Sequence, residues 1–280
     1  MAPYSSPVPT WRRDTYAAIS PDLPKLSTKG RNIVITGGGS GIGAAIAKSF
    51  ARSGAASISI LGRRQDVLSS TASELATDFP LTKFFKYVTD LTSRQSTFEA
   101  FEEIKSNIGT VDVLVANAGV MPKLTSIRDS DPEEFSQAID INVKGNLNLV
   151  QTFLPVASGK AVILHVSAGA VNLPFIPGFG GYHASKIAAA KIFDYLHHEN
   201  PELFVLNFHP GIIKTAMTGD AEGLAYDEIE LPADFAVWAA SEEAKFLNGK
   251  FVWANWDVDE LKTMSKMIRD GPKFTLGFNS

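Results

Sequence analysis

The sequence predicts an α/β fold: a single doubly wound domain with a seven-stranded, mostly parallel sheet and helices on both faces. Three observations predict it. Short β-branched runs alternate with stretches of helical periodicity from Asn32 onward, no linker or repeat interrupts the alternation, and a glycine-rich turn follows the first strand. Strands separated by amphipathic helices pair in parallel through crossovers. A chain of 280 residues with 45% hydrophobic residues can bury a large core in one domain.

Each expected strand is a short apolar run, and each expected helix has apolar residues three or four positions apart. We expect strands at 33–35, 57–61, 84–88, 111–115, 161–166, 203–208 and 250–254. We expect helices at 42–53, 65–77, 93–107, 131–154, 182–199 and 232–244. The fourth helix has the clearest start, because Asp131 is an N-cap residue, Pro132 suits the first helical position and Glu134 completes a capping box.

The two ends of the chain lie outside this alternation. Five prolines among the first 30 residues predict an N-terminal arm over 1–29 that adds no core element. The domain is expected over 30–257, and residues 258–280 are expected to form a C-terminal tail. A stretch rich in small residues, at about 215–231, is expected to cover the substrate as a lid.

Composition excludes several classes of function. The 26 Lys and Arg residues against 30 Asp and Glu give a net charge of −4, so no basic excess favours nucleic acid. Without cysteine the chain has no disulfide, thiolate zinc site or cysteine nucleophile, which is compatible with a reducing cytosol. No apolar run approaches the ~18 residues of a membrane span. We expect a cytoplasmic protein with no metal site and with neither a nucleic-acid nor a membrane partner.

A glycine-rich turn connects the first expected strand to the first helix. Gly37 permits a tight turn, Gly41 lets the backbone approach a pyrophosphate, and Gly43 lets helix and strand pack closely. The free N–H groups and the dipole of the first helical turn favour phosphate charge. The turn therefore predicts a Rossmann-type dinucleotide-binding domain.

The spacing of this turn, Thr-Gly-X-X-X-Gly-X-Gly, resembles that of the short-chain dehydrogenase/reductase family. Further family blocks follow in order: Asp90-Leu91, Asn117-Ala118-Gly119, Ile141 to Gly145, Tyr182-X-X-X-Lys186 and Pro210 to Thr215. The resemblance spans about 30–257 and, through the proline-bearing arm and residues 249–261, extends to reductases of filamentous fungi, which implies secondary metabolism. It implies these cofactor-binding residues: Gly37, Gly39, Ser40, Gly41, Ile42, Gly43, Arg63, Arg64, Asp90, Leu91, Asn117, Ala118, Gly119, Tyr182, Lys186, Pro210, Gly211, Ile213 and Thr215.

The residues after the second strand favour NADP over NAD. NAD-binding folds usually place an acid there on the ribose 2′-hydroxyl, whereas NADP-binding folds offer an arginine. Here Gly62 takes the acid position and Arg63 follows it, with Arg64 able to add a second contact or to stack on adenine. A guanidinium binds phosphate through paired, charge-assisted hydrogen bonds. We therefore expect NADP as the cofactor.

Tyr182 and Lys186 lie four residues apart, so they share one face of a helix. A tyrosine with an ordinary pKa of about 10 is a poor base at neutral pH, and a nearby lysine cation is expected to lower that pKa. The resemblance implies that Tyr182 gives or takes the hydroxyl proton and that Lys186 also binds the nicotinamide ribose. It further implies that Asn142 holds a proton-relay water near the lysine.

The remaining residue of the family's site is a serine that hydrogen-bonds the substrate oxygen. Counting back from Tyr182 places Ala168 at the expected position, so the role is vacant there. Ser167 fills it if the backbone shifts by one residue, although such a shift at a strand end reverses the side chain. Both alternatives stay open, and Ser167 is kept as a candidate catalytic residue.

Together these features predict an NADP(H)-dependent oxidoreductase that reduces a ketone, or oxidises the alcohol, on a medium-sized organic molecule. The apolar segment 173–179 is expected to line a pocket for an apolar or aromatic substrate. The alternative is a non-redox protein on the same scaffold, such as a cofactor-sensing binder, lyase, isomerase or cyclase, and Ala168 is its support. The resemblance also implies a homodimer or homotetramer that pairs through the helices at 131–154 and 182–199.

Overall fold

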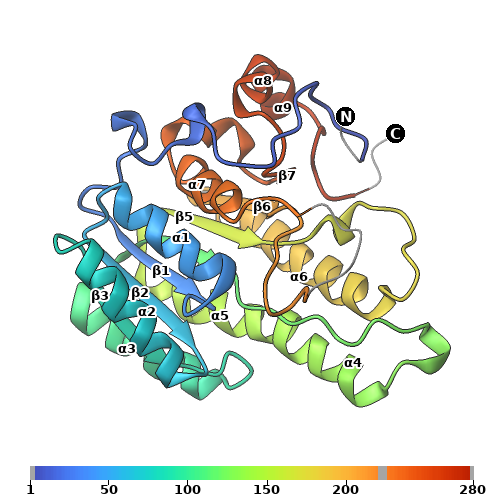
Figure 1. The fold of residues 1–280 in the computed structure, drawn as a ribbon, viewed down its shortest axis with the longest axis horizontal. Coiled ribbons are helices and arrows are strands. Elements are labelled where there is room, and N and C mark those ends of the chain that lie inside the picture. Colours follow the sequence, from blue (N-terminus) through green and yellow to red (C-terminus); the bar gives the residue numbers. More distant parts are fainter. Residues whose placement is uncertain (1–3, 220–225, 278–280) are drawn as a thin grey trace.

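A seven-stranded parallel sheet forms the centre of the computed structural model, which describes residues 4–219 and 226–277 (Figure 1). In spatial order the strands are β3 (Lys83–Val88), β2 (Ser57–Gly62), β1 (Asn32–Thr36), β4 (Val111–Ala116), β5 (Ala157–Val166), β6 (Phe204–His209) and β7 (Lys250–Trp253). Every pairing is parallel, so the expected sheet is confirmed. The strand order changes direction between β1 and β4, and in such sheets ligands bind at the carboxyl ends beside this point.

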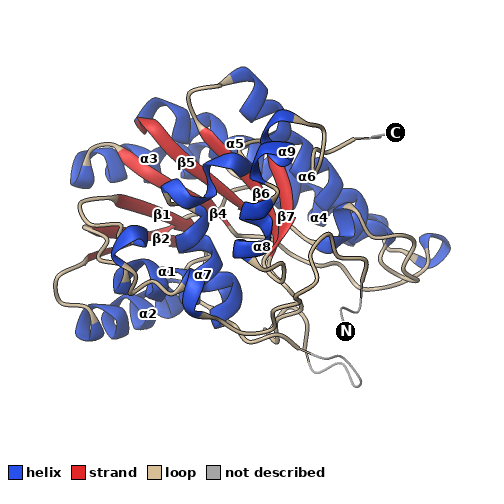
Figure 2. Cartoon of the chain, turned by 90° about the horizontal axis from the view of Figure 1, so that it is seen from above, coloured by secondary structure: helices blue, strands red, loops and turns tan. Residues whose placement is uncertain are grey.

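Helices cover both faces of the sheet (Figure 2). One face carries α1 (Gly41–Arg52), α2 (Gln65–Asp78) and α7 (Glu230–Ala239), and the other carries α3 (Arg94–Ile108), α5 (Gly145–Phe153) and α6 (Gly180–Glu199). Strand β1 shows how the sheet supplies both hydrophobic layers. Its Ile33 and Ile35 are buried in the layer of α1 and α7, whereas Val34 is buried in the layer of α3, α5 and α6. This alternation is what a two-residue side-chain period requires.

The long helix expected from Asp131 contains a structural change that the sequence pattern did not predict. Helix α4 (Pro132–Ile139) begins where Asp131 accepts a hydrogen bond from the Glu133 N–H at 2.9 Å. It passes into α5 through one π-helical turn, Asp140–Lys144, which contains Asn142. Single π turns inside α-helices occur frequently at functional sites.

The helix expected at 232–244 ends earlier, because α7 stops at Ala239 and a 3-10 helix (Glu242–Leu247) follows. The Ser241 hydroxyl explains the break. It donates to the Trp238 carbonyl at 2.6 Å and accepts from the Glu243 N–H at 3.2 Å, so one side chain ends the first helix and caps the second.

The N-terminal segment does contribute to the core, so the expectation of an arm without core residues is wrong for residues 4–29. Val8, Ile19 and Leu26 are buried in the same hydrophobic layer as α1 and α7. In Figure 1 the blue segment runs along α7 toward α8 (Val258–Thr263). Its prolines do keep the backbone irregular, but the side chains between them still bury apolar surface.

Residues 258–277 also fold onto the body, where a tail was expected. They form α8 and α9 (Ser265–Asp270), with Val258, Leu261 and Ile268 buried. The carboxylate of Asp257 caps α8 by accepting hydrogen bonds from two backbone N–H groups of its first turn, each at 3.0 Å. Beyond α9 the Phe274 carbonyl accepts a hydrogen bond from the Phe251 N–H at 2.8 Å and so covers part of the edge of β7.

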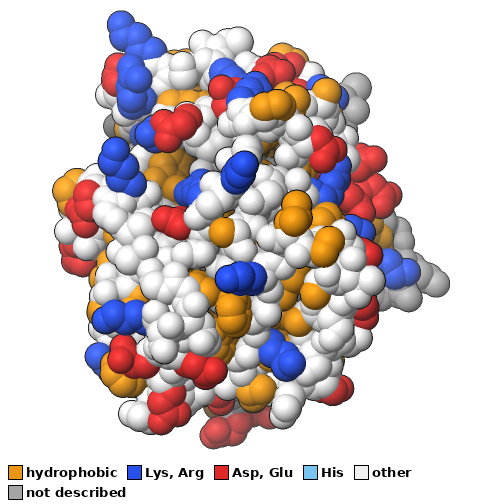
Figure 3. Space-filling view, turned by 90° about the vertical axis from the view of Figure 1, so that its left-hand side faces the viewer, with side chains coloured by type: hydrophobic (Ala, Val, Ile, Leu, Met, Phe, Trp, Pro, Cys, Tyr) orange, Lys and Arg blue, Asp and Glu red, His pale blue; other side chains and the backbone are white. Residues whose placement is uncertain are grey.

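The surface in Figure 3 carries interspersed positive and negative side chains, with hydrophobic ones in small separate groups. Within residues 4–219 and 226–277, no helix has the length and apolar character that a membrane crossing requires. The same residues contain no cluster of three or more His, Asp or Glu side chains placed to hold a metal ion.

Candidate active site

A cavity of about 650 Å3 opens at the carboxyl ends of the strands, beside the point where the strand order changes direction. Its walls come from the glycine-rich turn, the ends of β2, β3, β4 and β5, one face of α6 and the segment after β6. The predicted site residues that line it are Gly37, Gly39, Ser40, Gly41, Ile42, Arg63, Arg64, Asp90, Leu91, Asn117, Ala118, Gly119, Ser167, Tyr182, Lys186, Pro210 and Thr215. Four predicted residues lie behind the wall: Gly43, Asn142, Gly211 and Ile213.

The glycine-rich turn is packed too closely for side chains at two positions. Gly37 has φ of +66°, and a Cβ there would lie 2.9 Å from Nδ2 of Asn117. A Cβ on Gly43 would lie 2.3 Å from the Gly37 carbonyl oxygen, so helix α1 approaches the turn at backbone distance. Gly41 and Ile42 at the start of α1 line the cavity, and the N-terminus of a helix suits the charge of a phosphate.

Thr36 holds β1 and β4 together at the floor of the cavity, a role that motif reasoning missed. Its hydroxyl oxygen accepts hydrogen bonds from the backbone N–H groups of Asn117 and Ala118, both at 3.0 Å. The Asn117 amide donates in return to the Thr36 carbonyl at 2.9 Å. The signal was present in the sequence, because Thr36 is the first residue of the glycine motif.

Arg63 and Arg64 follow β2 at the rim of the cavity, with both side chains exposed. Arg64 donates from Nη2 to the Ser40 hydroxyl at 3.4 Å, which links the rim to the glycine-rich turn. Gly62 precedes them at the end of β2 and also lines the cavity. This part of the site therefore presents cationic side chains at the position where the ribose of a dinucleotide is expected.

Tyr182 and Lys186 lie on the first two turns of α6 and face the cavity together. Burial raises the pKa of Tyr182 to about 12 and lowers the pKa of Lys186 to about 8. The Lys186 amine donates to the Val166 carbonyl at 3.1 Å and lies 5.9 Å from the centre of the Tyr182 ring. The expected lowering of the tyrosine pKa is therefore wrong for this structure, because burial of the phenol raises its pKa.

Asn142 lies on the π-helical turn and holds the loop that follows β4. Its Oδ1 accepts from the Val120 N–H at 2.8 Å, and its Nδ2 donates to the Val120 carbonyl at 2.8 Å and to the Ser185 hydroxyl at 2.9 Å. Ser185 in turn donates to the carbonyl of Tyr182 at 2.9 Å. The asparagine thus connects the cavity wall at Val120 to the helix that carries Tyr182 and Lys186.

Ser167 and Ala168 occupy different positions relative to the cavity. Ser167 lines it, and its hydroxyl is buried without a hydrogen-bond partner, whereas Ala168 does not line it. The backbone explains the difference, because the Ser167 N–H donates to the Phe208 carbonyl at 2.8 Å and extends the β5–β6 pairing by one residue. Two residues further on, the N–H of Gly169 donates to Nδ1 of His209 at 2.9 Å.

His165 and His209 lie at the ends of β5 and β6; both are buried, and neither lines the cavity. Nδ1 of His165 lies 2.7 Å from the Asn207 side-chain oxygen, and its ring stacks on Phe193 with centres 4.3 Å apart. Burial, together with the nearby Lys186, lowers the pKa of each histidine to about 3. Both are neutral core residues at neutral pH.

The apolar segment 173–179 differs from its expected position, because none of its residues lines the cavity. Leu173 packs against the core next to Gly169, and the Phe175 side chain is 86% exposed. The predicted lid at 215–231 is only partly described. Thr215, Ala216 and Met217 line the cavity, and residues 220–225 lie outside the described residues.

Comparison with known proteins agrees with this geometry. The profile of the short chain dehydrogenase family matches residues 31–223. The chain belongs to the short-chain dehydrogenase family. Over 279 residues this family member is 32% identical to a short chain dehydrogenase/reductase of Claviceps purpurea, covering 97% of this chain and 94% of that protein. It is 34% identical to a short chain dehydrogenase of Monascus ruber, covering 96% of this chain and 92% of the other.

Solved structures of other short-chain dehydrogenases share the fold. An alcohol dehydrogenase from Thermococcus sibiricus, complexed with 5-hydroxy-NADP, superposes with a TM-score of 0.69 at 28% identity, covering 74% of this chain and 89% of that one. A protein from Pseudomonas syringae described as a short chain dehydrogenase superposes with a TM-score of 0.77 at 24% identity, covering 83% of this chain and 97% of that one. This short-chain dehydrogenase therefore has the Rossmann fold of its family.

Proposed function

We propose that this short-chain dehydrogenase is an NADP(H)-dependent enzyme that reduces a ketone, or oxidises the alcohol, on a medium-sized organic molecule. The observation that carries the proposal is the convergence of Tyr182, Lys186 and Ser167 on the same cavity as the glycine-rich turn and Arg63. The alcohol dehydrogenase complexed with 5-hydroxy-NADP supports the choice of cofactor.

The residues around the cavity fit a dinucleotide phosphate. Gly37 and Gly43 leave a backbone-lined cradle that a Cβ would fill, and the N-terminus of α1 opens onto it. Arg63 and Arg64 at the rim suit the added charge of a 2′-phosphate. When bound, NADPH supplies the hydride to the carbonyl carbon of the substrate.

The side chains of this chain divide the remaining chemistry. A pKa of about 12 keeps the phenol of Tyr182 protonated at neutral pH, so it can donate a proton to the oxygen of the reduced carbonyl. Lys186, with a pKa of about 8, is largely cationic at neutral pH and stabilises the phenolate that remains. The unpaired hydroxyl of Ser167 can donate a hydrogen bond to the developing oxyanion.

The proposal is tested by NADPH oxidation with a panel of aliphatic and aromatic ketones, using the unmutated protein and Tyr182→Phe. This substitution keeps the ring and deletes the proton donor, so turnover should fall by roughly 10²–10⁴. The dissociation constant for NADPH should stay unchanged, since the ring still fills its place. Full turnover by Tyr182→Phe would exclude the assigned role, and an inert unmutated protein across the panel would exclude ketone reduction.

We further propose that the enzyme acts in the cytoplasm, in secondary metabolism, as a homodimer or homotetramer. Exposed apolar side chains on the two helices expected to pair support self-association: Leu147 on α5 is 43% exposed, and Ile187 and Tyr195 on α6 are 44% and 64% exposed. Light scattering at micromolar concentration tests this, and a species of 30.2 kDa alone would contradict it.

A further inference from the structure

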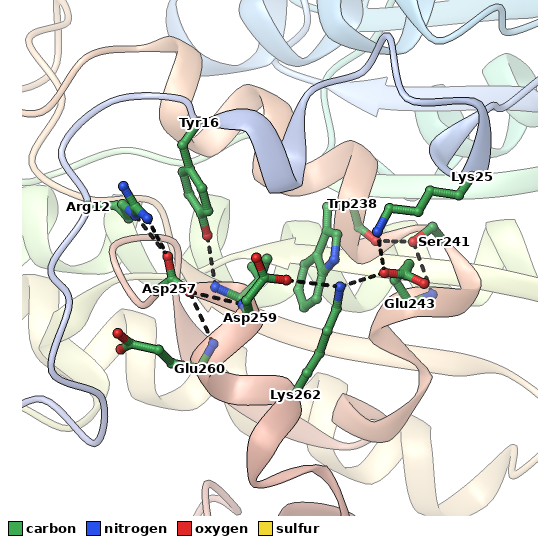
Figure 4. Close-up of polar contacts among 11 residues, drawn as sticks. Arg12, Tyr16, Lys25, Trp238, Ser241, Glu243, Asp257, Asp259, Glu260 and Lys262 are labelled. Atoms are coloured by element: carbon green, nitrogen blue, oxygen red, sulfur yellow. Dashed lines mark hydrogen bonds and ion pairs between the residues drawn. The ribbon is translucent and has the colours of Figure 1, made fainter.

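An N-terminal strap, residues 10–16, is attached to the start of helix α8 (Figure 4). The guanidinium of Arg12 donates from Nε and Nη2 to Oδ2 of Asp257 at 2.9 and 2.7 Å, and it stacks over the ring of Tyr16 at 4.2 Å. The hydroxyl of Tyr16 accepts a hydrogen bond from the first backbone N–H of α8 at 2.9 Å. Figure 4 shows both side chains directed at this helix start.

The backbone of the strap is bonded to two further segments, the one between β7 and α8 and the one that leads into α7. The Arg12 N–H donates to the Asn255 carbonyl at 2.7 Å, and the Asn255 amide donates to the Arg12 carbonyl at 2.8 Å. The Arg13 carbonyl accepts from the Glu228 N–H at 2.7 Å. The Arg13 guanidinium contacts Oδ1 of Asp227 at 3.3 Å, so the strap reaches a buried carboxylate.

Asp227 is the link between the strap and the cavity wall. Its side chain is 4% exposed, and Oδ2 accepts hydrogen bonds from the Ile212 N–H and the Asn255 amide, each at 3.0 Å. The Asp227 N–H donates to the Ile212 carbonyl at 2.8 Å, so both polar backbone groups of Ile212 are bonded to one residue. Gly211 has φ of +95°, and a Cβ there would lie 2.6 Å from Oδ2, which shows how closely the carboxylate approaches this turn.

The turn that Asp227 holds lies between two residues of the cavity wall, Pro210 and Thr215. Its backbone leaves β6 with a left-handed glycine, so it has no regular secondary structure to fix it. A buried carboxylate with several donors is a rigid anchor for such a turn, because each bond constrains the same two oxygens.

We propose that Asp227 is a positioning residue for the NADP(H) site and that residues 10–16 are part of that site's support. Through Ile212 and Gly211, the carboxylate fixes the wall between Pro210 and Thr215 in the geometry that accepts the cofactor. The proposal rests on the proposed function, since the cavity must bind NADP(H) for the wall to matter.

The experiment compares three variants of the full chain with the unmutated protein. Asp227→Ala removes the acceptor for Ile212 and the contact with Arg13. Asp227→Asn keeps an amide oxygen for Ile212, but it loses the charge and replaces the oxygen that contacts Arg13 with an NH2 donor. The matched control is Asp234→Ala. Asp234 is a second buried carboxylate that does not line the cavity; it accepts from Thr15 at 2.6 Å and from Ser49 on α1, and its loss leaves the contacts of Arg12 and Arg13 in place.

The readouts are the NADPH dissociation constant by fluorescence titration, the thermal unfolding midpoint, and hydrogen exchange of the Ile212 amide. An unpaired buried donor costs enough to weaken NADPH about tenfold in Asp227→Ala and about twofold in Asp227→Asn. Exchange at Ile212 should accelerate in Asp227→Ala and stay slow in Asp227→Asn. The Asp234→Ala control should lower the unfolding midpoint and leave the NADPH dissociation constant unchanged.

Two results would overturn the inference. One is an unchanged NADPH dissociation constant in Asp227→Ala, and the other is an equal weakening in Asp234→Ala, which would mean general destabilisation. If Asp227→Ala fails to fold, the same measurements on Asp227→Asn test the proposal. Slow exchange at Ile212 together with an unchanged NADPH dissociation constant would then refute the contribution of the strap. An unmutated protein that binds no NADPH would overturn the proposed function itself, and the inference with it.

Discussion

Separate substitutions of Ser167 and Ala168, the two residues after β5, test which of these positions serves the substrate oxygen. Ser167→Ala removes a hydroxyl that is buried, unpaired and in the cavity wall, and Ala168→Ser adds one at a position outside that wall. Because the Ser167 hydroxyl has no partner in the protein, its hydrogen-bonding capacity remains available to a substrate oxygen. We therefore predict that Ser167→Ala impairs ketone reduction and that Ala168→Ser changes it little.

The magnitude follows from the role. Losing one donor to a developing oxyanion costs ~3 kcal/mol of transition-state stabilisation, about a hundredfold in rate. Stability should respond differently, because the substitution breaks no internal hydrogen bond and leaves no partner unsatisfied. Ser167→Ala should therefore unfold at the same temperature as the unmutated protein, or slightly above it.

The assay is steady-state reduction of the best ketone from the panel, with kcat and KM determined separately for both variants. NADPH titration and thermal unfolding are the controls, and both should match the unmutated protein. The reasoning fails if Ser167→Ala retains full activity. If Ala168→Ser instead raised the rate, the serine role would be vacant in the natural sequence, as the spacing back from Tyr182 suggests.

Three further predictions concern charge. Arg63→Ala should remove most of a preference for NADPH over NADH of at least tenfold, or about 1.4 kcal/mol, and equal affinities in the unmutated protein would contradict the assignment. Lys186 titrates at about 8 when folded and at 10.5 ordinarily, so the unfolded state binds more protons between these values and stability rises with pH across them. Lys186→Met should therefore abolish turnover yet raise the unfolding free energy at pH 7 by up to about 3 kcal/mol, measured by urea denaturation. His165 and His209 titrate at about 3 when folded and at 6.5 ordinarily, so their contribution is complete above pH 6.5 and is lost toward pH 3. Between pH 3 and pH 6.5, each histidine should make the unfolding free energy rise with pH by up to about 1.4 kcal/mol per pH unit. If this pH dependence were the same in His165→Asn as in the unmutated protein, the prediction for His165 would be refuted.

The sheet and its helices could be predicted because their residues follow local periods. Strand β1 could be predicted without tertiary information, because its side chains Ile33, Val34 and Ile35 alternate between the two faces of the sheet. The glycine-rich turn that follows it could be predicted in the same way. Strand β5 shows the limit. It begins at Ala157, four residues before the expected start, in a polar stretch that joins the sheet beside β4. Pairing with a neighbour, and not intrinsic preference, extends such a strand.

Other features depend on contacts between residues far apart in the sequence. The N-terminal strap looked like an arm because its prolines exclude regular structure, yet Arg12 binds Asp257, a partner 245 residues away. The pKa of Tyr182 was expected to fall because Lys186 lies one turn away, but the degree of burial decides it, and burial is a property of the assembled fold. The π-helical turn at Asn142 leaves no trace in the hydrophobic pattern on either side of it.

Three locally unfavourable features are concentrated at one place. A buried lysine, an unpaired serine hydroxyl and a π-helical turn each cost stability, and Lys186, Ser167 and Asn142 all lie in or directly behind the wall of the cavity. A core selected for stability alone would replace the lysine and the serine with apolar residues and keep the helix regular. Their shared location means that the local conflicts are retained for what the cavity does. The Lys186→Met prediction measures this directly, since one substitution should add stability and remove activity.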